Sequence, residues 1–445
     1  MSNYTFIVAQ KFYSKKKGVG LPLPPEDGSL RPNHFMNKRI LFISLLVFVL
    51  TACSVQPAPD AQPQATPPDS TAVPTAALTE SVAEDLFPVK AELRHARAFS
   101  VEYFDTYKVV TIHEPWRDAG TTFTYILVQR GTSLPESVAV DEQENLQVIE
   151  IPIRKIAALS TTHLPYLVEI NALESLAAVG NAGYVNTPSV VARLQNGQTQ
   201  SVGNGPEVNI ESLLDINPDI ITTTALGNPK KDDYQQLLQR GFKVLIVSDF
   251  MEETPLGRAE WIKFMSLFYN LEAEAENIFA DIEERYQSMQ ALAASSGQRP
   301  TVIMGFEING QWNMPGGKSY QAAYIRDAGG DYLWADDDST GRIPLSFEAV
   351  IEKGLQADYW FNQSVSWLTA EDVLAADPRY SNFLAFQQGQ VYNNNARLNE
   401  TGGNDYNESG HSHPEVILAD LISILHPELL PEHDLVYYRS LKIGE

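Results

Sequence analysis

One stretch decides the fold that this sequence encodes: residues 271–296, LEAEAENIFADIEERYQSMQALAASS. Its apolar residues recur three or four positions apart, at 271, 275, 278, 282, 286, 289 and 292, which is the spacing of one helix face. Glutamates occupy the first turns, where the helix dipole favours anions, and Gly297 and Pro300 supply the stop. At about 1.5 Å per residue the predicted helix is a rod of roughly 39 Å, long enough to run across two packed lobes.

An internal repeat flanks this rod. Residues 209–222 read NIESLLDINPDIIT, and residues 346–361 read SFEAVIEKGLQADYWF. Each copy predicts a short helix with a Glu near its start, a turn, and an Asp that leads into a buried strand. The repeat pairs four acidic side chains: Glu211 with Glu348, and Asp219 with Asp358. The pattern predicts two related α/β lobes, and a cleft between two lobes is where a small ligand binds.

Strands and helices alternate through both halves, which predicts parallel sheets. We expect a helix from about residue 162 to about 178, and a helix that begins at Pro255 with Thr254 as its N-cap. Residues 309–320 are expected to form a glycine-rich polar loop. Before the first lobe, residues 99–153 alternate apolar and polar side chains and predict a β-rich extension of three or more strands.

Charge and cysteine content exclude some functions. The chain of 445 residues carries a net charge of −24. Residues 1–53 contribute +5, from seven Lys/Arg and two Asp/Glu, so the remainder carries −29. Such an acidic surface argues against nucleic-acid binding, which needs a basic patch. Cys53 is the single cysteine, so no intrachain disulfide is possible.

The N-terminal part reads as a targeting segment. Met36 begins Met-Asn-Lys-Arg, an apolar run follows at 40–50, and the run ends in Leu-Thr-Ala-Cys53. That tetrapeptide resembles the bacterial lipobox, which implies a diacylglycerol on Cys53 as the mature N-terminus; the alternative is a plain secretory signal. We expect residues 1–35 to be an upstream extension and translation to start at Met36.

These observations predict the following division of the chain. Residues 1–53 are the extension and signal peptide, 54–87 a Pro/Ala/Thr-rich tether, 88–270 the N-terminal lobe, 271–297 the linker helix and 298–445 the C-terminal lobe.

Eight stretches together resemble one family. They are KIAALSTTHLPYL (155–167), NIESLLDINPDII (209–221), ETPLGRAEWIKF (253–264), MPGGKSY (314–320), YLWADDDSTG (332–341), VYNNNARLN (391–399), GGNDY (402–406) and HPELLPEHDLVYY (426–438). Over roughly residues 90–441 the chain resembles class III substrate-binding proteins of ABC importers, the ferric-siderophore and cobalamin type. The resemblance implies two Rossmann-like lobes with parallel sheets, joined by a single long rigid helix.

The resemblance also implies a function. A monomeric, lipid-anchored bacterial protein, in the periplasm or on the outer face of the cytoplasmic membrane, captures an Fe(III)-siderophore and delivers it to an ABC permease dimer with its cytoplasmic ATPase. No resident cofactor or metal is expected. Glu211 and Glu348 correspond to the surface glutamates that, in this family, pair with permease arginines. The chain departs from close relatives at Asn407, where a Trp is expected, and at the pair His411 and His413.

Ligand contacts are expected on loops at strand ends, because ligands of open α/β sheets bind there. The expected contacts are Thr162, His163, Tyr184, Asn204, Trp312, Lys318, Tyr320, Trp367, Arg397 and Tyr406. Aromatic rings supply flat contact area, and Arg397 and Lys318 are the cations expected to meet an anionic chelate. The alternative for each residue is ordinary loop packing.

Three other functions compete with this interpretation. A cobalamin or haem binding protein would have the same fold. A zinc or manganese binding protein would need three or four His and carboxylates in the cleft, where His163, His411 and His413 are the histidines expected. An enzyme is disfavoured, because the sequence contains no HExxH, no GxSxG, no Walker A motif and no GxGxxG after a strand.

Overall fold

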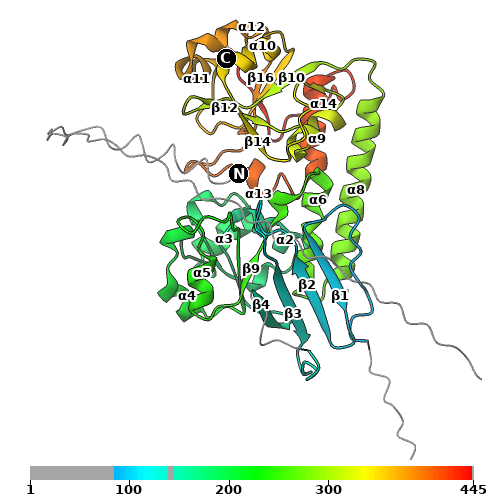
Figure 1. Ribbon diagram of the computed structural model, residues 1–445, viewed down its shortest axis with the longest axis vertical. Coiled ribbons are helices and arrows are strands. Elements are labelled where there is room, and N and C mark those ends of the chain that lie inside the picture. The colour runs from blue at the N-terminus through cyan, green and yellow to red at the C-terminus, as the bar shows by residue number, and fades with distance from the viewer. Residues whose placement is uncertain (1–84, 139–144, 443–445) are drawn as a thin grey trace, which may run out of the picture. The chain divides into compact units, whose positions relative to one another are not determined.

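The computed structural model describes residues 85–138 and 145–442, which form two α/β lobes and a β-sheet that precedes them (Figure 1). The predicted signal peptide with Cys53, and most of the predicted tether, lie outside the described residues. In the described part, no helix is both long and apolar enough to cross a membrane.

The first lobe is built on a five-stranded parallel sheet in the order β7-β6-β5-β8-β9. Its strands are β5 (Ile156–Ala158), β6 (Leu176–Val179), β7 (Gln200–Ser201), β8 (Ile220–Thr223) and β9 (Val244–Ile246). Its helices are α2 (Leu164–Glu169), α3 (Pro188–Gln195), α4 (Ile210–Ile216), α5 (Tyr234–Gln239), α6 (Pro255–Ala259) and α7 (Trp261–Ser266).

The second lobe has a five-stranded sheet in the order β13-β10-β15-β16-β17, in which only β17 is antiparallel. A three-stranded antiparallel sheet, β11-β12-β14, lies in the same part of the chain. The strands are β10 (Thr301–Met304), β11 (Glu307–Ile308), β12 (Gln311–Pro315), β13 (Asp331–Tyr332), β14 (Arg342–Leu345), β15 (Tyr359–Asn362), β16 (Val391–Asn393) and β17 (Arg439–Ser440). The helices are α9 (Tyr320–Asp327), α10 (Phe347–Gly354), α11 (Ala370–Ala376), α12 (Leu384–Gln387), α13 (Asp405–Glu408) and α14 (Pro414–Leu425).

The internal repeat is visible in both sheets. The order β6-β5-β8-β9 in the first lobe is matched by β13-β10-β15-β16 in the second. The paired aspartates play the same part in each copy: Asp219 accepts from the backbone N–H of Lys155 at 2.9 Å, and Asp358 accepts from that of Thr301 at 2.8 Å. Each aspartate therefore ties the start of one strand to the strand beside it.

The rod is α8 (Glu272–Ala294), and it packs against α7 of the first lobe and against α9 and α14 of the second (Figure 1). Its 23 residues span about 34 Å. At its first turn the buried Glu272 pairs with the fully buried Lys108, 2.5 Å away. Further along, Tyr286 donates to Asp327 of the second lobe at 2.8 Å. The predicted linker helix and the two-lobe fold class are confirmed.

The β-rich extension is a four-stranded sheet in chain order: β1 (Phe99–Tyr103), β2 (Tyr107–Ile112), β3 (Phe123–Gln129) and β4 (Leu146–Ile151). Its side chains cover the edge strand β9. Tyr125 accepts from the N–H of Ile246 at 2.8 Å, and the amide of Gln147 bonds both the N–H and the C=O of Val244. The extension thus satisfies backbone groups that an open sheet edge would leave unpaired.

Two buried carboxylates hold the segment that leads into β1. Glu260 accepts from the N–H groups of residues 94–96, and Glu252 accepts from those of residues 97 and 98. Lys263, also fully buried, balances Glu260 at 2.9 Å. These contacts fasten the extension to the region that carries α6 and α7.

Two local predictions were wrong. The helix expected up to residue 178 ends at Glu169, because Asn171 adopts a left-handed conformation with φ 57°, and the residues beyond form β6. The polar loop expected at 309–320 contains strand β12, whose Trp312 is buried. Thr254 caps α6 as expected, since its side chain accepts from the N–H of Gly257, and Pro255 is the first helical residue.

Candidate functional site

A cavity of about 210 Å³ lies between the two lobes. The first lobe and its extension contribute Arg117, Ser160, Thr162, Thr224, Asp249, Phe250, Met251 and Arg258. The second lobe contributes Ser319, Tyr320, Gln321, Thr340, Gly341, Arg342, Asn407 and His411. Ser160, Thr224 and Asp249 each follow the carboxyl end of a parallel strand, which is where α/β sheets bind ligands.

A smaller cavity, of about 60 Å³, continues this site. It shares Ser160 and Asn407 with the larger one, and it is also lined by Tyr184, Asn204 and a glycine-rich stretch of the second lobe at 402–403. The two cavities together form one interlobe cleft, and we use that name for them below.

Arg258 of α6 is the buried cation of the cleft. Its side chain is 10% exposed, and Nη2 donates to Asp249 Oδ2 at 3.2 Å. The guanidinium also lies over the ring of Tyr320, 4.3 Å from its centroid, so this residue contacts both lobes. Arg258 Nε has no hydrogen-bond partner within the described residues. Burial alone would raise the pKa of Asp249, but the charge of Arg258 and its hydrogen bond outweigh burial, and the pKa is lowered.

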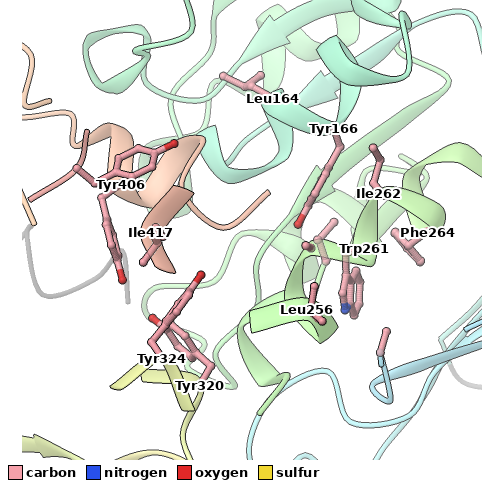
Figure 2. Close-up of a cluster of buried hydrophobic side chains, with 14 of the residues drawn as sticks. Leu164, Tyr166, Leu256, Trp261, Ile262, Phe264, Tyr320, Tyr324, Tyr406 and Ile417 are labelled. Carbon is pink, nitrogen blue, oxygen red and sulfur yellow. The ribbon is translucent and has the colours of Figure 1, made fainter. Parts of the chain in front are cut away.

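Tyr320 stands in a cluster of tyrosines in which the lobes meet. Figure 2 shows Tyr320, Tyr324 and Tyr406 gathered beside Ile417, while Tyr166 approaches from the first lobe near Trp261. The Tyr320 and Tyr324 rings are 6.3 Å apart, and Tyr166 donates to the backbone carbonyl of Arg258 at 3.0 Å. These rigid rings support Arg258 from two sides.

Two buried histidines lie behind the cation. His411 Nε2 is 3.7 Å from Asp249 Oδ2, and His163 Nδ1 is 2.9 Å from Thr222 Oγ1. Burial, helped by Arg258, lowers the pKa of His411 to about 3, and burial lowers the pKa of His163 to about 4. Both imidazoles are therefore neutral near pH 7 and add no positive charge to the site.

The charge of the cleft is opposite to that of the chain. Three arginines line it, Arg117, Arg258 and Arg342, and Asp249 is the one acidic residue that lines either cavity. The chain as a whole carries −24. A positive, partly buried site of this kind attracts an anion and holds it with charge-assisted hydrogen bonds.

The lobes are in direct contact at one end of the cleft. Glu408 of the second lobe is fully buried and accepts from the N–H of Asn186 at 2.8 Å and from that of Thr187 at 2.7 Å. Asn399 Nδ2 donates to the carbonyl of Gly183 at 3.1 Å. The segment around α13 is therefore docked on the first lobe at this end of the cleft.

Four of the ten expected ligand contacts line the cleft: Thr162, Tyr184, Asn204 and Tyr320. The other six line neither cavity. His163, Trp312, Trp367 and Tyr406 are buried, and the three aromatic residues pack against other rings. Lys318 pairs with Asp338 at 2.8 Å and Arg397 with Asp405 at 2.9 Å, and neither cation lines either cavity.

Residues that the sequence did not single out make up most of the site's charge. Arg258 lies in the quoted stretch 253–264, where only a helix beginning at Pro255 was expected. Arg117 belongs to the extension, where no chemistry was expected, and Arg342 follows an acidic turn. Of the expected departures, Asn407 and His411 line the cleft, whereas His413 lines neither cavity and its Nε2 lies 3.0 Å from Glu169 Oε1. In residues 85–138 and 145–442, no group of three or more His, Cys, Asp or Glu side chains is arranged to hold a metal ion.

Comparison with known proteins gives consistent matches. Residues 156–398 match the family model described as a periplasmic binding protein. Two uncharacterized lipoproteins of Methanocaldococcus jannaschii are each 26% identical, one over 316 residues (68% of this chain, 72% of the relative) and one over 313 (66% and 76%). A periplasmic binding protein from Veillonella parvula superposes with a TM-score of 0.50 at 13% identity, covering 74% of this chain and 98% of that structure. At that identity the structural likeness concerns the fold alone.

The two buried histidines predict an acid-side loss of stability. Their pKa values are depressed in the folded state, from an ordinary value near 6.5 to about 4 and about 3, so the unfolded state binds protons that the folded state does not. Stability is present above pH ~6.5 and is lost as the pH falls toward 4, by up to about 1.4 kcal/mol per pH unit for each proton. Urea unfolding at pH 7, 6, 5 and 4 measures this slope.

In a His163→Asn variant, the free energy of unfolding should depend less steeply on pH than in the native chain. The variant lacks one of the two imidazoles that take up a proton only in the unfolded state. The exposed His113→Asn variant is the control. Equal slopes for the His163 variant and the native chain would contradict the prediction.

Proposed function

Because this chain belongs to the periplasmic binding protein family, we propose that it is the solute-binding component of an ABC importer and captures an anionic ferric chelate of the siderophore class in the interlobe cleft. The single observation that carries the ligand class is the trio Arg117, Arg258 and Arg342 in the cleft of an otherwise acidic chain. Guanidinium groups match carboxylate and catecholate oxygens in geometry as well as charge.

The balance of charge supports an anion more than a free cation. Asp249 is already paired with Arg258, so the acidic side chain that lines the cleft is not available to a metal ion. The Nε–H of Arg258 is a buried hydrogen-bond donor for which no described residue supplies an acceptor. A buried donor without a partner is costly, and a ligand oxygen would complete it. The neutral histidines and tyrosines around it provide apolar and hydrogen-bonding contact for the rest of the ligand.

The size of the cleft indicates that the two lobes move apart when a ligand enters. At about 210 Å³ the main cavity is smaller than the ~300–1,000 Å³ typical of ligand sites. Entry of a chelate therefore requires the lobes to separate at contacts such as Glu408 with residues 186–187, while α8 keeps them connected. We propose that Thr162, Tyr184, Asn204 and Tyr320 contact the ligand together with the arginines.

Ligand binding is tested by tryptophan fluorescence of the full-length protein, titrated with an anionic ferric tris-catecholate, a neutral ferric tris-hydroxamate, haem and cobalamin. We expect the anionic ferric complex to bind most tightly. Arg342→Gln should weaken that binding at least about tenfold, or about 1.4 kcal/mol, because it removes a charge that lines the cleft. Arg379→Gln is the matched control, since Arg379 is exposed and pairs with Asp377 away from the cleft.

Preferred binding of the neutral complex or of cobalamin, with no effect of Arg342→Gln, would overturn the anionic ligand class. Tight binding of haem alone would move the assignment to a carboxylate-bearing iron porphyrin.

We propose in addition that Glu211 and Glu348 dock the permease. Both are exposed, and each is the second residue of a short helix, α4 or α10, that begins with a side-chain N-cap. A glutamate near a helix N-terminus is stabilised by about 0.3–1 kcal/mol, so the helix dipole accounts for either one alone. It does not account for the same position being acidic in both lobes. Two widely separated charges would fix orientation on a partner and speed its encounter.

A Glu211→Ala, Glu348→Ala double variant should bind the ferric chelate with unchanged affinity but lose uptake into cells. Both quantities are measured, by fluorescence titration and by radioactive iron accumulation. Full uptake by the double variant would remove the docking role, and lost ligand binding would place these residues in the cleft or the core.

We propose finally that the protein is anchored to the membrane through Cys53, which lies outside the described residues. The support is the Leu-Thr-Ala-Cys53 sequence after an apolar run, and relatives that are themselves named lipoproteins. Cell fractionation tests it: Cys53→Ala should release the protein from membranes, and unchanged membrane association would contradict the anchor.

A further inference from the structure

The connection between β2 and β3 reaches the cleft from outside the part of the chain that matches the family. Residues 113–122 belong to the extension, and the match begins at residue 156. Arg117 of this connection nevertheless lines the main cavity beside Thr340, Gly341 and Arg342 of the second lobe. The extension therefore contributes one charged side chain to a cleft that the two lobes otherwise line.

The connection is fixed in place by several contacts. Ser248 Oγ, which follows β9, donates to the carbonyl of Pro115 at 2.9 Å in a buried bond. Trp116 packs on Phe123 and Tyr234, with ring centroids 6.2 and 5.6 Å away. Gly227 allows this approach, because a Cβ there would lie 2.5 Å from Trp116 Nε1. Arg117 is therefore presented from an anchored turn and not from a free loop.

Arg117 is exposed, and its side chain reaches the second lobe at the surface of the protein. Its Nη2 donates to Thr340 Oγ1 at 2.9 Å. The guanidinium also lies against Gly341, where an added Cβ would stand 2.6 Å from Nη2 and 3.0 Å from Cζ. A glycine at this position is thus what lets the side chain lie flat on the second lobe.

We propose that Arg117 is a latch that holds the closed cleft over its ligand, a role that rests on the proposed capture of an anionic chelate. When the lobes meet, the guanidinium bonds Thr340, packs on Gly341 and offers its charge to the same ligand that Arg258 and Arg342 contact. The latch retains an anionic ligand, and without the Arg117 side chain the cleft opens more often and the ligand dissociates faster. In this way the extension takes part in retaining the ligand.

A latch has a kinetic signature that differs from electrostatic steering. A steering charge at a rim changes the association rate, whereas a contact made only in the closed form changes the dissociation rate. Stopped-flow fluorescence with the anionic ferric tris-catecholate measures both. Arg117→Gln should raise the dissociation rate at least about tenfold and leave the association rate within about threefold. Arg154→Gln, an exposed arginine before β5 at the opposite end of the sheet, is the control.

Two variants test the contact without altering Arg117. Gly341→Ala places a methyl group where the guanidinium lies and should reproduce the effect of Arg117→Gln. Thr340→Val removes the acceptor and should raise the dissociation rate less. In the Arg117→Gln background, Thr340→Val should have no further effect, because the two side chains form one interaction. An unchanged dissociation rate in Arg117→Gln, a lowered association rate alone, or additive effects of the pair would overturn the latch.

A measurement without ligand separates this inference from the proposed function. Small-angle X-ray scattering of the ligand-free full-length protein compares the native chain with Arg117→Gln, Gly341→Ala and Arg154→Gln. The first two variants should have a larger radius of gyration than the native chain and the control, because the lobes separate more often. Equal radii would overturn the latch even if the native protein binds the chelate. Failure of the native protein to bind any chelate would overturn the proposed ligand and leave the scattering result to decide the latch.

Discussion

Much of this structure depends on the burial of one positive charge, the guanidinium of Arg258. A charge removed from water must be paired, and leaving one unpaired costs roughly 3–5 kcal/mol. Here Asp249 supplies the counter-charge from the first lobe and Tyr320 supplies a ring face from the second. Burial, helped by the same cation, lowers the pKa of His411 and keeps that imidazole neutral. The site therefore holds a fixed, buried positive charge in a residue that lines the cleft.

The extension and both lobes contribute to the surroundings of that charge. Glu252 and Glu260 bind successive backbone N–H groups of the segment before β1, and they flank α6, the helix that carries Arg258. Tyr125 and Gln147 cover the edge of β9, whose carboxyl end leads to Asp249. The sheet β1–β4 thus covers the edge strand β9, and the segment before it is bonded to the residues that flank Arg258. The same extension places Arg117 at the cleft. The long helix α8 connects the two lobes and packs against α7 of the first and α9 and α14 of the second.

Periodicity and self-similarity made the architecture predictable from sequence, and the chemistry of the cleft much less so. The spacing of apolar residues located α8, and the repeated Glu and Asp positions located equivalent strands in both lobes, because these features are local in the chain. The charged centre is not local: Arg258, Asp249 and Arg342 meet only once both lobes are folded. Lys318 and Arg397 were expected in the cleft from their loops, but each is close to an aspartate that pairs with it. Trp312 was expected in a polar loop and is buried on β12, where its indole N–H bonds the carbonyl of Met304.

The central claim is that the interlobe cleft receives an anionic ferric complex on its arginines. Anomalous diffraction at the iron absorption edge, from crystals grown with the ferric tris-catecholate, tests it most directly. The account predicts one strong iron peak between the lobes, with chelate oxygens in hydrogen-bond contact with Arg258 and Arg342. An iron peak outside the cleft, or a chelate in the cleft that touches neither arginine, would contradict it.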